Sequence, residues 1–266
     1  MHPIERLRWV ARAPEGDVGL AAVEAAEALA AFAHDPPGLV IACRRLIGRR
    51  PSAGPLWWLA SRVLCALDPV AEAYAAMADL ERDPTGALLS VELPGGTIAV
   101  VGWPELASRA LRSAERVAVV SGVRGVPEKE AGREGRRLLH RLDDLGIDAR
   151  LLGPEAAARR AALVLLEAHA AGPYGFVAPA GSGALARAAR EASAPVWLVV
   201  GVGRRLPAAL FGALTSHLHL DVADPEILPF DLVDEVAGPG GRAEPAAAAA
   251  GRTDCPVAPE LLHLPR

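Results

Sequence analysis

The 266-residue sequence has little of several residue types that mark common classes of protein. Its three cysteines are far apart and form no CxxC pair, so we expect neither disulfides nor a metal site, and the absence of an N-terminal signal pattern indicates a reducing cytoplasm. Lys129 is the only lysine and the formal net charge is -4, which argues against direct nucleic-acid binding. Apolar runs are shorter than the roughly 20 residues of a membrane-spanning helix, so no membrane association is expected.

Helical periodicity dominates the first third of the chain. Apolar residues recur on one face after Asp17, which is placed as an N-cap, and Pro36, Pro37 and Gly38 end that first helix. Further helices are predicted near residues 39–48, from Ser52, and after Asp68-Pro69. We therefore expect a helical domain of four short helices over residues 1–86.

An alternation of strands and helices follows. The β-branched runs "TIAVVGW" and "RVAVVSG" flank a predicted helix over residues 104–114, and an amphipathic helix over 128–145 precedes a strand in "IDARLL". The pattern of "RRAALVLLEAHAA" favours a helix. Residues 87–241 are predicted to form an α/β domain with a Rossmann-like parallel sheet. Residues 237–252 are rich in Pro, Gly and Ala and predict a mobile loop, so 242–266 is interpreted as a low-complexity loop and C-terminal tail.

The order of several motifs resembles one known family. "GRRPSAGPLWWLASRVL" is similar to the Arg-Pro-Ser/Thr-Ala turn of the translation initiation factor 2B alpha/beta/delta subunit family, which includes ribose-1,5-bisphosphate and methylthioribose-1-phosphate isomerases. "LVLLEAHAAGPYGFVAPAGSGALARAARE" is similar to the strand, glycine turn and Asn-Lys-x-Gly-Thr segment of that family, and "ILPFDLVDEVAGPGG" to its closing signature. The resemblance covers residues 20–241 and implies that residues 163–166 form a central strand rather than a helix.

The resemblance also implies that the family's isomerase groups are missing. The catalytic cysteine position falls on Gly102, the aspartate position on His169, and the Asn-Lys pair on Ala178 and Pro179. General acid–base catalysis needs titratable groups beside the reacting carbon, each supplying about 10²–10⁴-fold. We therefore expect a protein without isomerase activity. His169 remains a candidate base, since imidazole titrates near pH 6.5, and the alternative is a structural or solvated histidine.

A phosphate site is predicted where a strand turns into a helix. Gly181, Ser182 and Gly183 would present free amides of a first helical turn, which attract anions; the alternative is that Ser182 only caps the helix. By resemblance, Arg50 and Arg124 are candidate phosphate-binding arginines, each with the alternative of a solvated charge. Ligands of open α/β sheets bind beyond the carboxyl ends of the strands, where we expect Gly102 to lie beside the corner.

These observations predict a cytoplasmic initiation-factor-2B-like protein that binds a phosphorylated small molecule, a sugar phosphate or nucleotide, or serves as an assembly subunit. The alternative is an active sugar-phosphate isomerase that uses His169. No cofactor is expected, because the glycines of "VVGVGRR" lack the third glycine of a dinucleotide fingerprint. The resemblance implies a homodimer formed through the α/β domain.

Overall fold

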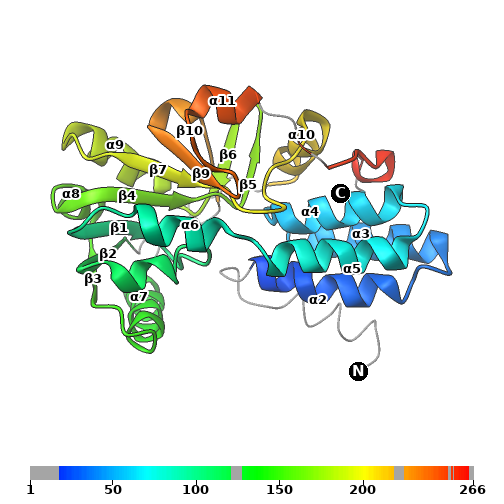
Figure 1. The fold of residues 1–266 in the computed structure, drawn as a ribbon, viewed down its shortest axis with the longest axis horizontal. Helices are drawn as coiled ribbons and strands as arrows, with labels where there is room; N and C mark the ends of the chain where they lie inside the picture. The colour runs from blue at the N-terminus through cyan, green and yellow to red at the C-terminus, as the bar shows by residue number, and fades with distance from the viewer. Residues whose placement is uncertain (1–17, 121–127, 219–224, 251–252, 254, 264–266) are drawn as a thin grey trace.

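The computed structural model describes residues 18–120, 128–218, 225–250, 253 and 255–263, with the backbone alone for 128–134. Figure 1 shows helices at the N-terminal end of the chain packed beside a sheet that carries helices on both faces. An α/β fold with an N-terminal helical region is therefore confirmed.

In the helical region, aspartate N-caps and first-turn prolines mark the starts of several helices. The Asp35 carboxylate accepts from the Gly38 amide, and Asp68 accepts from the Val70 and Ala71 amides, so both act as N-caps. Prolines occupy the first turns of three of the helices. The helices are α2 (Val18–Ala30), α3 (Pro36–Arg49), α4 (Gly54–Cys65) and α5 (Pro69–Glu81).

Seven strands among the described residues form one sheet in the order β10-β9-β7-β4-β1-β2-β3. Every neighbouring pair is parallel except β9 and β10, and the central strands are buried on both faces. The strands are β1 (Thr97–Val101), β2 (Arg116–Val120), β3 (Ala149–Leu152), β4 (Ala161–Glu167), β7 (Val196–Val199), β9 (Glu235–Gly238) and β10 (Gly241–Ala243).

A second, three-stranded sheet has the order β5-β6-β8 and is antiparallel. It lies beyond the carboxyl end of β4, because β5 follows that strand after two residues. Its strands are β5 (Ala170–Gly172), β6 (Gly175–Ala178) and β8 (Glu226–Leu228). The remaining elements are α6 (Thr85–Glu92), η1 (Ala110–Ser113), α7 (Glu128–Asp143), α8 (Pro154–Ala158), α9 (Ser182–Glu191), α10 (Ala208–Ser216), η2 (Phe230–Leu232), α11 (Pro245–Ala250) and η3 (Pro259–Leu261).

Four segments differ from what the sequence pattern alone predicts. Pro36, Pro37 and Gly38, expected to end the first helix, form the first turn of α3, because Asp35 caps that helix and proline fits its first turn. Residues 163–166 lie in strand β4, so the resemblance was right and the helical pattern was wrong: burial on both faces selects continuous apolar residues in either structure. The predicted helix over 104–114 contains only the short 3₁₀ helix η1. Residues 237–252, predicted as a loop, contain the end of β9, β10 and α11, because strand pairing and packing against η2 stabilise a composition that is weak by itself.

The C-terminal segment returns to the helical region. The Ser61 hydroxyl of α4 donates to the Pro256 carbonyl at 2.6 Å and accepts from the Ala258 amide at 2.8 Å. Ala258 and Leu261 are fully buried in the same apolar core as α4. The end of the chain thus completes the helical core rather than forming a separate tail.

Among the described residues, no helix is both long enough and apolar enough to cross a membrane.

Candidate functional site

The corner between β6 and α9 has the conformation that the glycines of the sequence predict. Gly181 is the N-cap of α9 with φ of 95°, a left-handed conformation that glycine adopts without strain. A Cβ at Gly181 would lie 3.8 Å from Val101 Cγ1, so the corner stands beside the end of β1, next to Gly102. Gly102 also has positive φ, and a Cβ there would meet nothing within 4 Å.

The amides of this corner are not free for a ligand. Gly181 N–H donates to Glu226 Oε1 at 3.1 Å, and Gly183 N–H donates to Glu226 Oε2 at 2.7 Å. Glu226 reaches the corner because β8 pairs with β6 and places it opposite Ala178. The Ser182 amide donates to the Pro179 carbonyl. The prediction that these amides are free to bind an external anion is therefore wrong, because the chain supplies its own carboxylate.

Ser182 occupies the first helical position and is fully buried. Its hydroxyl has no hydrogen-bond partner among the described residues, so it does not act as the cap that the sequence suggested. The only side-chain acceptor that the structure gives to the corner's amides, within the described residues, is the Glu226 carboxylate. This arrangement satisfies the helix N-terminus and its dipole with an internal negative charge.

His169 lies between β4 and β5, at the junction with the helical region. Its amide donates to the Val177 carbonyl, and its carbonyl accepts from the Gly54 amide at the start of α4. The residue keeps a little exposed surface, but its Nδ1 is buried and has no partner among the described residues. Burial, together with the positive charges of Arg204 and Arg50, lowers its pKa to about 3. The imidazole is therefore neutral at physiological pH.

Arg204 is the centre of a buried ionic network beside His169. Its side chain is 2% exposed, and its Nη1 donates to the Ala168 carbonyl at 2.7 Å. Its Nη2 donates to Glu105 Oε2 at 2.5 Å, and Glu167 Oε2 lies 3.8 Å from Nη1. These contacts satisfy the guanidinium and hold it at the carboxyl ends of the strands.

Of the two carboxylates in the network, Glu105 joins the loop after β1 to the helical region, and Glu167 holds that same loop to β4. Glu105 accepts from the amides of Val18 and Gly19 at the start of α2, at 3.2 and 2.9 Å. Glu167 accepts from the Ala107 and Leu106 amides. Burial raises the pKa of Glu167 to about 7, although Arg204 and the amide donors oppose that effect.

The structure brings some of the predicted residues together. Arg50 is buried, 7% exposed, close enough to depress the pKa of His169, and its carbonyl accepts from the Ala53 amide in the turn that opens α4. Gly102 neighbours the 181–183 corner, as expected. Arg124 lies outside the described residues. Among the described residues, no group of three or more His, Cys, Asp or Glu could hold a metal ion.

Sequence reasoning missed Glu226, Glu105 and Arg204. Glu226 lies 43 and 45 residues from the glycines that it serves, and Arg204 lies 99 residues from Glu105, so no local pattern links the partners. A weak signal was present for Arg204 and Arg205, two adjacent arginines five and six residues after the buried strand β7, near the end of the sheet where ligands of open α/β sheets bind.

The N-terminal helices and the mostly parallel sheet, covered by helices on both faces, define a Rossmann-like α/β fold with an N-terminal helical region. This is the fold of the solved initiation factor 2B subunits and of methylthioribose-1-phosphate isomerase. Translation initiation factor eIF-2B from Pyrococcus horikoshii OT3 matches with a TM-score of 0.76 and 17% identity, covering 93% of this chain and 98% of that one.

Two further solved structures share the fold. The tetrameric eIF2B-beta2-delta2 complex from C. thermophilum gives a TM-score of 0.68 at 18% identity, with 93% of this chain and 92% of that chain covered. The 5-methylthioribose 1-phosphate isomerase from Pyrococcus horikoshii OT3 gives 0.62 at 18% identity, with 93% and 86% covered. No protein-family model and no curated protein sequence matches the chain.

Proposed function

We propose that this chain is a divergent member of the initiation factor 2B subunit family that binds a phosphorylated small molecule, a sugar phosphate or nucleotide, without isomerising it. The observation that carries the proposal is the buried guanidinium of Arg50, which lies near His169 at the carboxyl ends of the strands and, together with Arg204, lowers the pKa of that histidine. Guanidinium groups in a site of low dielectric favour a phosphate, which they bind through paired hydrogen bonds.

Two features support a non-catalytic role. Gly102, at the family's cysteine position, has no side chain to act as nucleophile or acid, and the space where a Cβ would stand is open. His169 has a pKa of about 3, so it is a weak base at pH 7, far from the matched pKa that proton transfer needs. The alternative of an isomerase that uses His169 is therefore disfavoured by the electrostatics of the site.

The phosphate is assigned to the side of Arg50 and His169 rather than to the 181–183 corner. At the corner, a phosphate would have to displace the Glu226 carboxylate from two amide donors. The buried Nδ1 of His169 has no hydrogen-bond partner among the described residues, and burying a polar atom without a partner costs free energy. A ligand hydroxyl that donates to Nδ1 would remove this cost.

Thermal unfolding with AMP, ribose-1,5-bisphosphate and methylthioribose-1-phosphate tests this proposal. A ligand at 100 times its dissociation constant should stabilise the native state by about 2.7 kcal/mol. Arg50→Gln should abolish the shift, whereas Arg49→Gln, which removes the exposed neighbouring arginine, should keep it. Turnover of either sugar phosphate above the no-enzyme control would contradict the non-catalytic assignment.

A second candidate is an assembly subunit without a ligand, and the filled corner favours it. One solved structure of this fold is a tetrameric complex. We infer for this candidate a homodimer formed through the α/β region. Absence of a thermal shift with all three ligands, combined with a dimer in light scattering, would select the assembly role over metabolite binding.

A further inference from the structure

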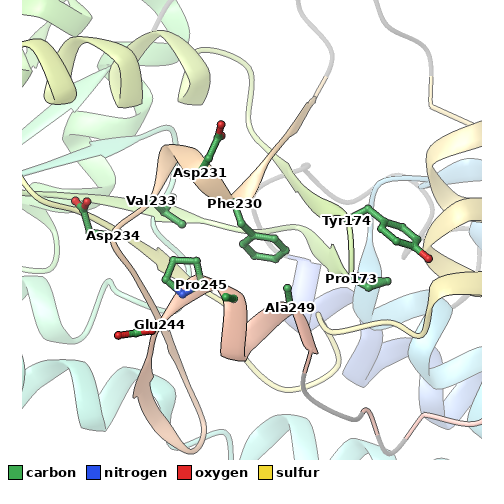
Figure 2. Close-up of a pocket in the computed structure, with 10 residues that line it drawn as sticks. Pro173, Tyr174, Phe230, Asp231, Val233, Asp234, Glu244, Pro245 and Ala249 are labelled. Carbon is green, nitrogen blue, oxygen red and sulfur yellow. The ribbon is translucent and has the colours of Figure 1, made fainter.

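A separate cavity of about 600 Å³ lies on the α/β region, away from the residues of the candidate site. It is bounded by the turn between β5 and β6, by η2 and by α11 (Figure 2). Tyr174, at the tip of that turn, is 80% exposed. Cavities of roughly 300–1,000 Å³ are the usual size of binding sites.

The aromatic lining is held in place from behind. Phe230 packs against the ring of Phe176, which is fully buried, with ring centroids 5.7 Å apart. Figure 2 shows the Phe230 ring between Pro245 of α11 on one side and Tyr174 on the other, with Ala249 of α11 below the ring. A half-buried ring and an exposed ring are thus presented together on one apolar surface.

All charged side chains that line the cavity carry negative charge. They are Asp231, Asp234 and Glu244, all exposed. In Figure 2 they lie around the aromatic centre and turn away from the Phe230 ring. Asp234 is fixed because its Oδ2 accepts from the Val196 amide at 2.7 Å. Carboxylates in these positions attract a cation to the opening of the cavity. The rings of Phe230 and Tyr174 are then the surface that the cation contacts.

We propose that this cavity binds an arginine-bearing segment of a protein partner. A guanidinium is planar and weakly hydrated, so it stacks on an aromatic face, while the surrounding carboxylates attract its positive charge without contacting it. The apolar residues beside the arginine would pack on Pro245 and Ala249. Because Tyr174 stands 80% exposed at the edge, an extended chain can lie across the opening. The proposal is independent of ligand binding at His169.

The two tyrosines of the chain allow a sharp test. In protein labelled with 3-fluorotyrosine, Tyr174 reports on the cavity, and Tyr74, 49% exposed on α5, is the internal control. Tyr174→Phe assigns the two fluorine resonances. A short peptide with a central arginine is titrated against its citrulline counterpart, which keeps the shape and removes the charge.

The arginine peptide should move the Tyr174 resonance and leave Tyr74 unchanged, and the citrulline peptide should bind about three- to five-fold more weakly, as expected for a cation–π contact at an exposed site. Asp231→Asn with Glu244→Gln should weaken the arginine peptide alone, whereas Glu81→Gln on α5 should not. Equal binding of the two peptides, movement of both resonances, movement of neither, or no effect of the double substitution would each overturn the proposal.

Discussion

The Glu226 carboxylate offers the most direct perturbation of the candidate site. It accepts from the amides of Gly181 and Gly183 at the start of α9. Glu226→Ala leaves both donors without their acceptor and removes a negative charge from the positive end of a helix. We expect this substitution to destabilise the native state and to open the corner to an external anion.

The two amides contribute unequally to the expected loss. Gly183 is buried, so its amide loses its acceptor without replacement by water, at a cost of about 1–3 kcal/mol. Gly181 is partly exposed, so water can take over its bond, and the helix dipole adds about 0.3–1 kcal/mol. Together these give about 1–4 kcal/mol for Glu226→Ala. Glu226→Gln keeps one carbonyl oxygen and should lose about half as much.

Urea unfolding measures these differences, with Glu191→Gln at the exposed end of α9 as the control. The control should stay within about 0.5 kcal/mol of wild type, as surface substitutions usually do. Inorganic phosphate should stabilise Glu226→Ala more than wild type, because the vacated amides of a helix N-terminus bind anions. The reasoning fails if Glu226→Ala unfolds within 0.5 kcal/mol of wild type, or if phosphate stabilises both proteins equally.

Three further predictions concern the buried network. The pKa of His169 is depressed to about 3, so protonation of the unfolded chain destabilises the wild-type protein as pH falls below 6.5. His169→Gln lacks this effect. In urea unfolding, the free energy of unfolding of the variant relative to wild type should therefore rise by about 3 kcal/mol between pH 7.5 and pH 4.5. The pKa of Glu167 is raised to about 7, so the protonated carboxyl stabilises the native state below pH 4.5, and this stabilisation is lost as pH rises through 7. Glu167→Gln should make the free energy of unfolding less dependent on pH between 4.5 and 7. Glu105→Gln removes the carboxylate that caps α2 and pairs with Arg204, and should cost about 3 kcal/mol in urea unfolding, since it leaves the buried guanidinium with only the more distant carboxylate of Glu167, 3.8 Å away.

Much of the fold follows from local sequence rules. Asp68-Pro69 correctly predicts a helix start, and the continuous apolar runs of β1 and β2 correctly predict buried parallel strands. The local rules fail where tertiary packing determines the secondary structure of a segment. The strand β4 has the same apolar composition as a buried helix, and its neighbours in the sheet determine its structure. Likewise, β10 forms because β9 offers it an edge.

The candidate site was predictable only in part, for a related reason. Gly102 and Gly181 could be placed together because the carboxyl ends of parallel strands meet at one edge of a sheet. The ionic partners could not, because Glu105 and Arg204 come from loops far apart in the chain, and only the folded sheet brings them within hydrogen-bond distance. The depressed pKa of His169 depends on that same burial, so the titratable residue was visible in the sequence and its protonation state was not.

The Gly-Ser-Gly corner shows why a local motif can predict a binding geometry without predicting its occupant. Gly181 and its positive φ are required by the turn, whichever anion accepts from the amides. Phosphate and carboxylate both satisfy a helix N-terminus. In this structure the amides bind a carboxylate rather than a phosphate, because the antiparallel pairing of β8 with β6 places Glu226 beside them. At this corner an external phosphate would have to displace an internal carboxylate, whereas the proposed binding at Arg50 beside His169 leaves the start of α9 intact.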